Sequence, residues 1–152
     1  MESRLNPYEI APEGYRAMSG LQQYVNRSGL DPRLLELAKL RASQINGCAY
    51  CIALHVREAR ALGETDERMH LLSAWHEAPI FTPREQAALA WTEALTRVAE
   101  TQVPNDVYER ARHHFSDKEL VDLSFAVVAI NSWNRLSVAF RRLPDTEAPR
   151  VP

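Results

Sequence analysis

Two cysteines, one histidine and one glutamate are the residues of this chain whose types and spacing suit chemistry. Cys48 and Cys51 form a Cys-x-x-Cys pair and are the only cysteines among the 152 residues. His55 follows Cys51 by four positions, and Glu36 precedes Cys48 in the chain. Residues four apart in a helix lie one above the other, so Cys51 and His55 share a face and Cys48 lies one turn earlier. The spacing predicts a dithiol beside a group that can accept a proton.

The expected position of the cysteines at the start of a helix favours a reactive thiolate. Asn46-Gly47 is typical of a helix end, so the next helix is expected to begin at or near Cys48. The unpaired N–H groups of a first turn stabilise a thiolate. His55 can accept the thiol proton or stand as a cation beside the sulfur. A hairpin of helices would return Glu36 towards Cys51 and His55, completing a carboxylate–imidazole–thiol relay.

Other interpretations of these residues remain open. Cys48, Cys51 and His55 offer three zinc ligands, with Glu36 or water as the fourth. The alternative function is therefore a zinc-binding protein or a structural interaction protein, since free cysteines are also often buried as small hydrophobic residues. Glu36 alone could be a solvated carboxylate on a helix face. The sequence has no second cysteine pair, and its other histidines lack clean ligand spacing. We expect these other histidines to be structural or surface residues: His70, His76, His113 and His114.

The elements that must position these residues are all predicted to be helices. Apolar residues recur at helical spacing, and no alternating strand pattern leads into a hairpin turn. Helices are expected over about 12–27, 31–46, 48–62, 65–76, 82–100, 104–115 and 116–143. Thr82 with Glu85 and Ser116 with Glu119 have the pattern of capping boxes. The last helix is apolar on most sides, so we expect it to be the central one.

Length, composition and charge indicate one globular domain over residues 1–152, with a core of about 13–143, an irregular N-terminal arm and a proline-rich C-terminal tail. A net charge of -2 argues against binding to nucleic acid or an anionic membrane. The amino end has no signal-peptide-like apolar stretch, and no apolar run reaches the roughly 20 residues that cross a bilayer. We therefore expect a cytoplasmic protein, in which a close cysteine pair is more often reactive than structural.

The order of these residues resembles the signature of a known family. The pattern Glu36, eleven residues, Cys-x-x-Cys and then His55 is similar to that of the alkylhydroperoxidase AhpD-like family, within the carboxymuconolactone decarboxylase-like superfamily. Blocks at 41–48, 57–63, 75–85 and 130–136 extend the resemblance over most of residues 15–142. The resemblance implies an all-α, single-domain bundle of about six or seven helices that forms homo-oligomers, either trimers or hexamers.

The resemblance also implies a function and a role for each residue. It implies that an alkyl hydroperoxide is reduced through a Cys48–Cys51 dithiol–disulfide cycle, with Cys51 as the peroxidatic thiol and Cys48 as the resolving thiol. Glu36 and His55 would move the protons. No cofactor or metal is implied, but a dithiol protein or a small thiol must reduce the bridge. A lactone decarboxylase activity is less favoured, because the decarboxylase-type relatives do without the dithiol.

The order of the two cysteines runs against a simple dipole argument, which would activate the more N-terminal sulfur of Cys48. The position of His55 one turn beyond Cys51 gives a physical reason for the order. One position departs from the family pattern: Tyr50 stands where the best-studied members carry a second histidine. A tyrosine does not act as a base near neutral pH, so the peroxidase could be weak or the reaction could be general thiol–disulfide exchange.

Polar residues in the last helix also call for an explanation. Asn131 and Asn134, with Arg135, interrupt its apolar stretch, and Asn131 and Asn134 share a face. Because buried amides must find partners, we expect them either to bond a neighbouring helix end or to line the active pocket. The tryptophans are expected in the core or at a subunit interface: Trp75, Trp91 and Trp133.

Overall fold

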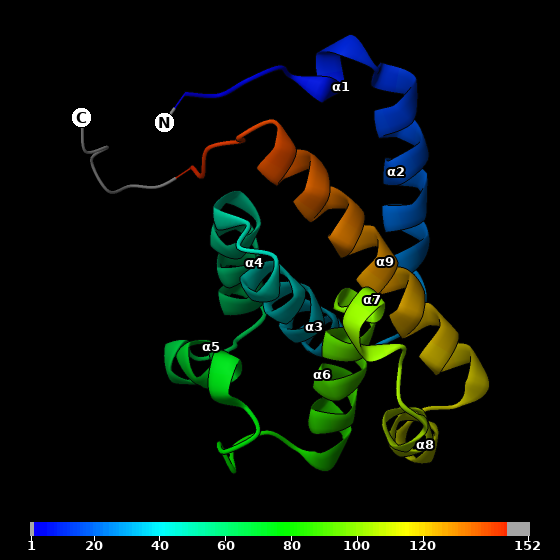
Figure 1. Cartoon of the computed structure of the whole chain (residues 1–152). Coiled ribbons are helices and arrows are strands. Elements are labelled where there is room, and N and C mark those ends of the chain that lie inside the picture. The colour runs from blue at the N-terminus through cyan, green and yellow to red at the C-terminus, as the bar shows by residue number, and fades with distance from the viewer. Residues whose placement is uncertain (1, 146–152) are drawn as a thin grey trace.

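Helices account for the regular structure of residues 2–145, the part of the chain that the computed structural model describes (Figure 1). They are α1 (Pro7–Ile10), α2 (Pro12–Asn26), α3 (Pro32–Ile45), α4 (Ala49–Ala61), α5 (Asp66–Leu71), α6 (Pro83–Thr96), α7 (Val98–Thr101), α8 (Asn105–His114) and α9 (Asp117–Ala139), with a 3₁₀ turn at Leu72–Ala74. Within 2–145 there is no strand, so the predicted all-α class is confirmed. Most of the predicted proline-rich tail, residues 146–152, lies outside the described residues.

Four details of the helices differ from the prediction. The arm over 1–12 contains α1, because the side chain of Asn6 caps a helix that begins with proline. The helix expected over 65–76 ends at Leu71 and continues as a 3₁₀ turn. The helix expected over 82–100 breaks at Arg97 (φ -104°, ψ 35°), which separates α7 from α6. The last helix ends at Ala139, because Arg141 adopts a left-handed backbone with φ 52°. The two four-residue helices, α1 and α7, raise the number above the expected six or seven.

The central helix is α3, and the expectation that the last helix would be central is wrong. Every residue from Leu34 to Leu40 is buried, and α3 packs against α4, α6 and α9. Helix α9 crosses the molecule beside α2 and the α3–α4 pair (Figure 1). It keeps an exposed apolar stripe at Val121, Phe125 and Val128. A charged side chain within this stretch of α3, from Leu34 to Leu40, is therefore shielded from water and must find a partner inside the protein.

Local signals in the sequence explain how α6 and α9 begin. Both predicted capping boxes are present, at the start of α6 and of α9. Trp75 and Trp91 are buried as expected, and their indole N–H groups donate to Glu93 and Ser124, respectively. Among the helices of residues 2–145, none is both long enough and apolar enough to cross a membrane.

Candidate active site

The turn between α3 and α4 places the cysteine pair at a helix start. Gly47 has φ +64°, a conformation that costs other residues roughly 1–2 kcal/mol. The N–H of Cys48 donates to the carbonyl of Ser43 (3.0 Å), and that of Gly47 donates to Gln44 (3.2 Å), which is a Schellman ending for α3. Cys48 is also the N-cap of α4, since its Sγ accepts from the N–H of Cys51 (3.3 Å). The predicted helix start at Cys48 is confirmed.

The two cysteines are joined to each other. Cys48 and Cys51 form a disulfide with their Cα atoms 5.3 Å apart. Both residues are buried, at 2% and 3% exposed. The bond shows that the two sulfurs can come within bonding distance, as a dithiol–disulfide cycle requires. In this oxidised form neither sulfur is a thiolate, and so neither is a zinc ligand.

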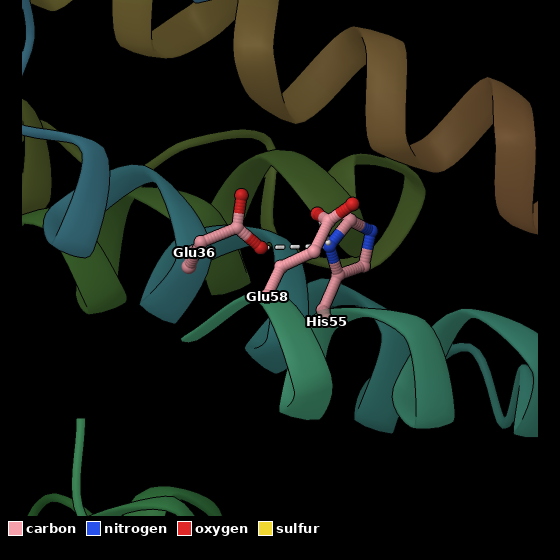
Figure 2. A group of neighbouring side chains, drawn as sticks. All are labelled: Glu36, His55 and Glu58. Carbon is pink, nitrogen blue, oxygen red and sulfur yellow. Dashed lines mark hydrogen bonds and ion pairs between the residues drawn. The ribbon is translucent and has the colours of Figure 1, made fainter. Parts of the chain in front are cut away.

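Glu36 reaches His55 across the α3–α4 hairpin, a contact that the sequence permitted without requiring it. The Nδ1 atom of His55 lies 2.8 Å from Oε2 of Glu36 and 3.3 Å from Oε2 of Glu58 (Figure 2). Glu36 and His55 are buried, at 5% and 7% exposed, whereas the side chain of Glu58 is 47% exposed. The alternative interpretation of Glu36 as a solvated helix-face carboxylate is therefore wrong.

Lys39 also belongs to this cluster, although the sequence did not predict it. Its Nζ lies 2.7 Å from Oε1 of Glu36, and its side chain is only 9% exposed. The signal was present in the sequence: Lys39 follows Glu36 by three positions within the apolar stretch from Leu34 to Leu40. Lysine is almost never fully buried unless it is paired. A buried helix with an acidic and a basic residue at this spacing indicates such a pair.

The environment of the pair sets the direction of both pKa values. Burial by itself would lower the pKa of His55, but the hydrogen bonds with Glu36 and Glu58 outweigh burial and raise it above the usual 6.5. Burial by itself would raise the pKa of Glu36, but the hydrogen bond with His55 and the charge of Lys39 outweigh burial and lower it. The two groups therefore favour an imidazolium facing a carboxylate.

Titration of His55 by NMR in the oxidised protein tests this arrangement. The pKa of His55 is expected above 6.5 in the wild type and lower in Glu36→Gln, because the substitution removes a negative charge and leaves the burial. Lys39→Met is expected to shift the pKa upwards, since Lys39 is the nearby positive charge that lowers it. An unchanged His55 pKa in Glu36→Gln would contradict the pairing.

The same shift makes a prediction about stability. Because the folded-state pKa of His55 is raised, its protonation stabilises the fold below about pH 6.5, and this contribution is lost as the pH rises through the folded pKa. The extra free energy of unfolding of the wild type over His55→Gln should therefore shrink between neutral and alkaline pH.

A cavity of about 570 Å³ opens beside this cluster. Its inner wall carries Glu36, Lys39, Cys51 and His55, whereas Cys48 is not among its lining residues. Across the cavity stand aromatic side chains from α1, α2 and α9. They are Tyr8, Tyr15 and Trp133, with Tyr15 packed edge-on against Tyr8 and Trp133 at centroid distances of 5.0 and 5.7 Å. Of the two cysteines, Cys51 thus lines the cavity and Cys48 does not.

The asparagines of α9 hold the turn rather than line the cavity. The amide nitrogen of Asn46 donates to Oδ1 of Asn131 (3.0 Å) and of Asn134 (2.9 Å). The amide of Asn134 donates to Oγ of Ser43 (3.1 Å), and Arg135 donates to the side chain and carbonyl of Asn131. Of the two interpretations given for Asn131 and Asn134, bonding to a neighbouring helix end is confirmed.

Among the described residues, one group of acidic and histidine side chains is close enough together to hold a metal ion, and it belongs to this same cluster. The ligand atoms of Glu36, His55 and Glu58 lie within 4.8 Å of one another, close enough to hold a cation. Lys39 already supplies a positive charge to that group. The remaining histidines lie on the surface or half-buried and do not line the cavity with Cys51: His70, His76, His113 and His114.

The fold and site together define an all-helical protein of the AhpD-like type, with a Cys-x-x-Cys disulfide beside a Glu–His pair. A model of the carboxymuconolactone decarboxylase family matches residues 12–94. The chain belongs to this family. It is 42% identical to the uncharacterized protein YdfG of Bacillus subtilis, over 91% of this chain and 95% of YdfG.

Solved structures agree with this assignment. Protein ATU0492 of Agrobacterium tumefaciens, of unknown function and suggested to be the antioxidant defence protein AhpD, is 44% identical with a TM-score of 0.94, over 96% of this chain and all of that one. A peroxidase-related protein of Ralstonia eutropha has a TM-score of 0.81 at 20% identity, over 92% of this chain and 75% of that one. The debrominase Bmp8 has a TM-score of 0.82 at 15% identity, over 91% and 74%. The last two share the fold, which supports more than one chemistry.

Proposed function

We propose that this chain is a thiol-dependent peroxidase that reduces organic hydroperoxides through Cys48 and Cys51. The observation that carries the proposal is the cavity that Cys51 lines together with the Glu36–His55 pair, while Cys48, outside the cavity lining, is bonded to Cys51. The similarity to ATU0492, suggested to be an antioxidant defence protein, supports the same function. The disulfide represents the end of the proposed oxidative step.

The first step oxidises Cys51 and reduces the hydroperoxide. His55, whose Nδ1 faces Glu36, takes the thiol proton of Cys51 on its other ring nitrogen, and this transfer gives the imidazolium that the pairing with Glu36 favours. The thiolate attacks the terminal oxygen of the hydroperoxide, so that an S–O bond forms and the O–O bond breaks. The leaving alkoxide takes the proton from His55 and departs as an alcohol. Cys51 is left as a sulfenic acid, and the charge of Lys39 keeps Glu36 ionised throughout.

The second step forms the disulfide, and a third step restores the dithiol. The Cys48 thiol condenses with the Cys51 sulfenic acid, so that an S–S bond forms and water leaves. An external dithiol protein or small thiol then supplies two electrons and two protons through a mixed disulfide. This cycle uses no bound cofactor. With Tyr50 in place of a second histidine, Glu36 and His55 carry the proton relay alone.

A cation held by Glu36, His55 and Glu58 is the second candidate, because their ligand atoms converge. In the reduced protein Cys51 could join them as a thiolate. Decarboxylation of a lactone is less favoured, since such relatives do without the dithiol. The homo-oligomeric state and the cytoplasmic location stay predictions from the sequence.

The test is to count thiols after one equivalent of cumene hydroperoxide is added to the reduced protein. The wild type is expected to lose both thiols and two hydrogens in mass within seconds to minutes. Cys48→Ser is expected to gain one oxygen, or more after over-oxidation, on Cys51. Two thiols that persist for hours would contradict the proposal, and about one equivalent of tightly bound zinc would support the cation site instead.

A further inference from the structure

Arg142 lines the cavity and its guanidinium contacts two aromatic rings. Its guanidinium carbon is 3.8 Å from the ring centroid of Tyr50 and 4.9 Å from that of Tyr8. A guanidinium stacked on rings keeps its N–H groups pointing outwards in its own plane. Within residues 2–145 no acceptor receives a hydrogen bond or ion pair from this side chain. The donors of Arg142 are therefore free for a ligand as far as the described chain is concerned.

The backbone, rather than a charged partner, holds Arg142 in this place. Helix α9 ends in a Schellman motif, in which the N–H of Arg142 donates to the carbonyl of Ser137 (2.9 Å) and Arg141 takes the left-handed position. Further along, the guanidinium of Arg57 on α4 donates to the carbonyl of Asp145 (2.7 Å). The segment that carries Arg142 is thus fastened to both α9 and α4.

The charges around the cavity are unevenly distributed. Near Cys51, the carboxylates of Glu36 and Glu58 face the cations Lys39 and His55 at distances up to 3.3 Å, so that end is internally paired. Among the described residues that line the cavity, Arg142 is the cationic side chain that takes no part in these ion pairs. Tyr15 and Trp133, whose rings pack against each other, add an aromatic part to the cavity lining.

We propose that the cavity binds a carboxylate-bearing aromatic molecule, with its ring against Trp133 and Tyr15 and its carboxylate held by Arg142. A planar guanidinium fits a carboxylate through two parallel hydrogen bonds, and a cavity of about 570 Å³ accommodates a ligand of this size. If the proposed peroxidase function holds, the substrate is the hydroperoxide of such an acid, with its O–O bond at Cys51. The binding of the acid itself does not depend on the peroxidase function.

Binding is tested first, with the oxidised protein and unreactive probes. By calorimetry, 4-isopropylbenzoate is expected to bind about tenfold or more tightly than the neutral 4-isopropylbenzyl alcohol, because a charged acceptor strengthens the hydrogen bonds. The preference should fall to about one in Arg142→Gln and should survive in Arg141→Gln. Arg141 is the matched control, since it is the adjacent arginine and does not line the cavity. Equal affinities in the wild type, or a preference retained in Arg142→Gln, would overturn the proposal.

The proposed substrate class is tested by comparing the rate of oxidation by the hydroperoxide of 4-isopropylbenzoate with the rate of oxidation by cumene hydroperoxide. The wild type is expected to oxidise faster with the carboxylate-bearing hydroperoxide, through a lower KM, and Arg142→Gln is expected to lose that difference. Oxidation by both hydroperoxides at equal KM would overturn the substrate class and leave the peroxidase function standing. Tight binding of the benzoate without oxidation by either hydroperoxide would overturn the peroxidase function and support the carboxylate site.

Discussion

Replacing His55 with glutamine is expected to slow the oxidation of Cys51 by cumene hydroperoxide about 10²–10⁴-fold at neutral pH, the usual contribution of a general base. His55 is the buried base on the cavity wall beside Cys51, and Glu36 orients it through Nδ1. Glutamine keeps the size and the hydrogen-bonding capacity but cannot take a proton. The rate is measured by mixing reduced protein with hydroperoxide in a single turnover.

A matched control for His55 is Glu58→Gln. Its carboxylate also contacts Nδ1, at 3.3 Å, but its side chain is half exposed. Water screens an exposed charge, so the expected loss in rate is less than about tenfold. The deficit of His55→Gln should narrow at alkaline pH, where the Cys51 thiol ionises without help. A wild-type rate in His55→Gln at neutral pH would contradict the relay.

The second large effect is expected in stability. Asn134 is fully buried, accepts from Asn46 and donates to Ser43, which binds the end of α3 to α9. Asn134→Ala removes both hydrogen bonds, and the buried Oγ atom of Ser43 loses the amide that donates to it. The free energy of unfolding should fall by about 2–3 kcal/mol, because buried polar groups that lose their partners cost this much. Chemical denaturation of the oxidised protein measures the change.

Ser132→Ala provides the control on the same helix. The Ser132 hydroxyl bonds only the carbonyl of Val128, one turn earlier in α9, so its loss should change the free energy of unfolding by less than about 0.5 kcal/mol. In Asn134→Ala the amide hydrogens of Gly47 and Cys48 should also exchange faster, since the turn loses one of its attachments. Equal stability of the two variants would show that the asparagine contacts do not hold the turn.

Local sequence determined most of the helices and the order of the reactive residues. Helical periodicity, the two capping boxes and Gly47 act over a few residues, and each is present where the sequence predicted it. The Cys-x-x-Cys spacing at a helix start also brings its two sulfurs together by local geometry alone. For the same reason the position of His55 one turn after Cys51 needed no tertiary information.

Only the tertiary structure decided what surrounds these residues. The contact between Glu36 and His55 joins two helices, and the sequence permitted it without requiring it. That α3 rather than α9 is central depends on which neighbours cover each helix, which periodicity does not record. Lys39 is paired because α3 is enclosed, and Arg142 meets Tyr8 across most of the chain length. Helix formation depends on neighbouring residues, whereas cavity walls depend on contacts between distant ones, so the sequence alone predicted the reactive group but not the cavity that it faces.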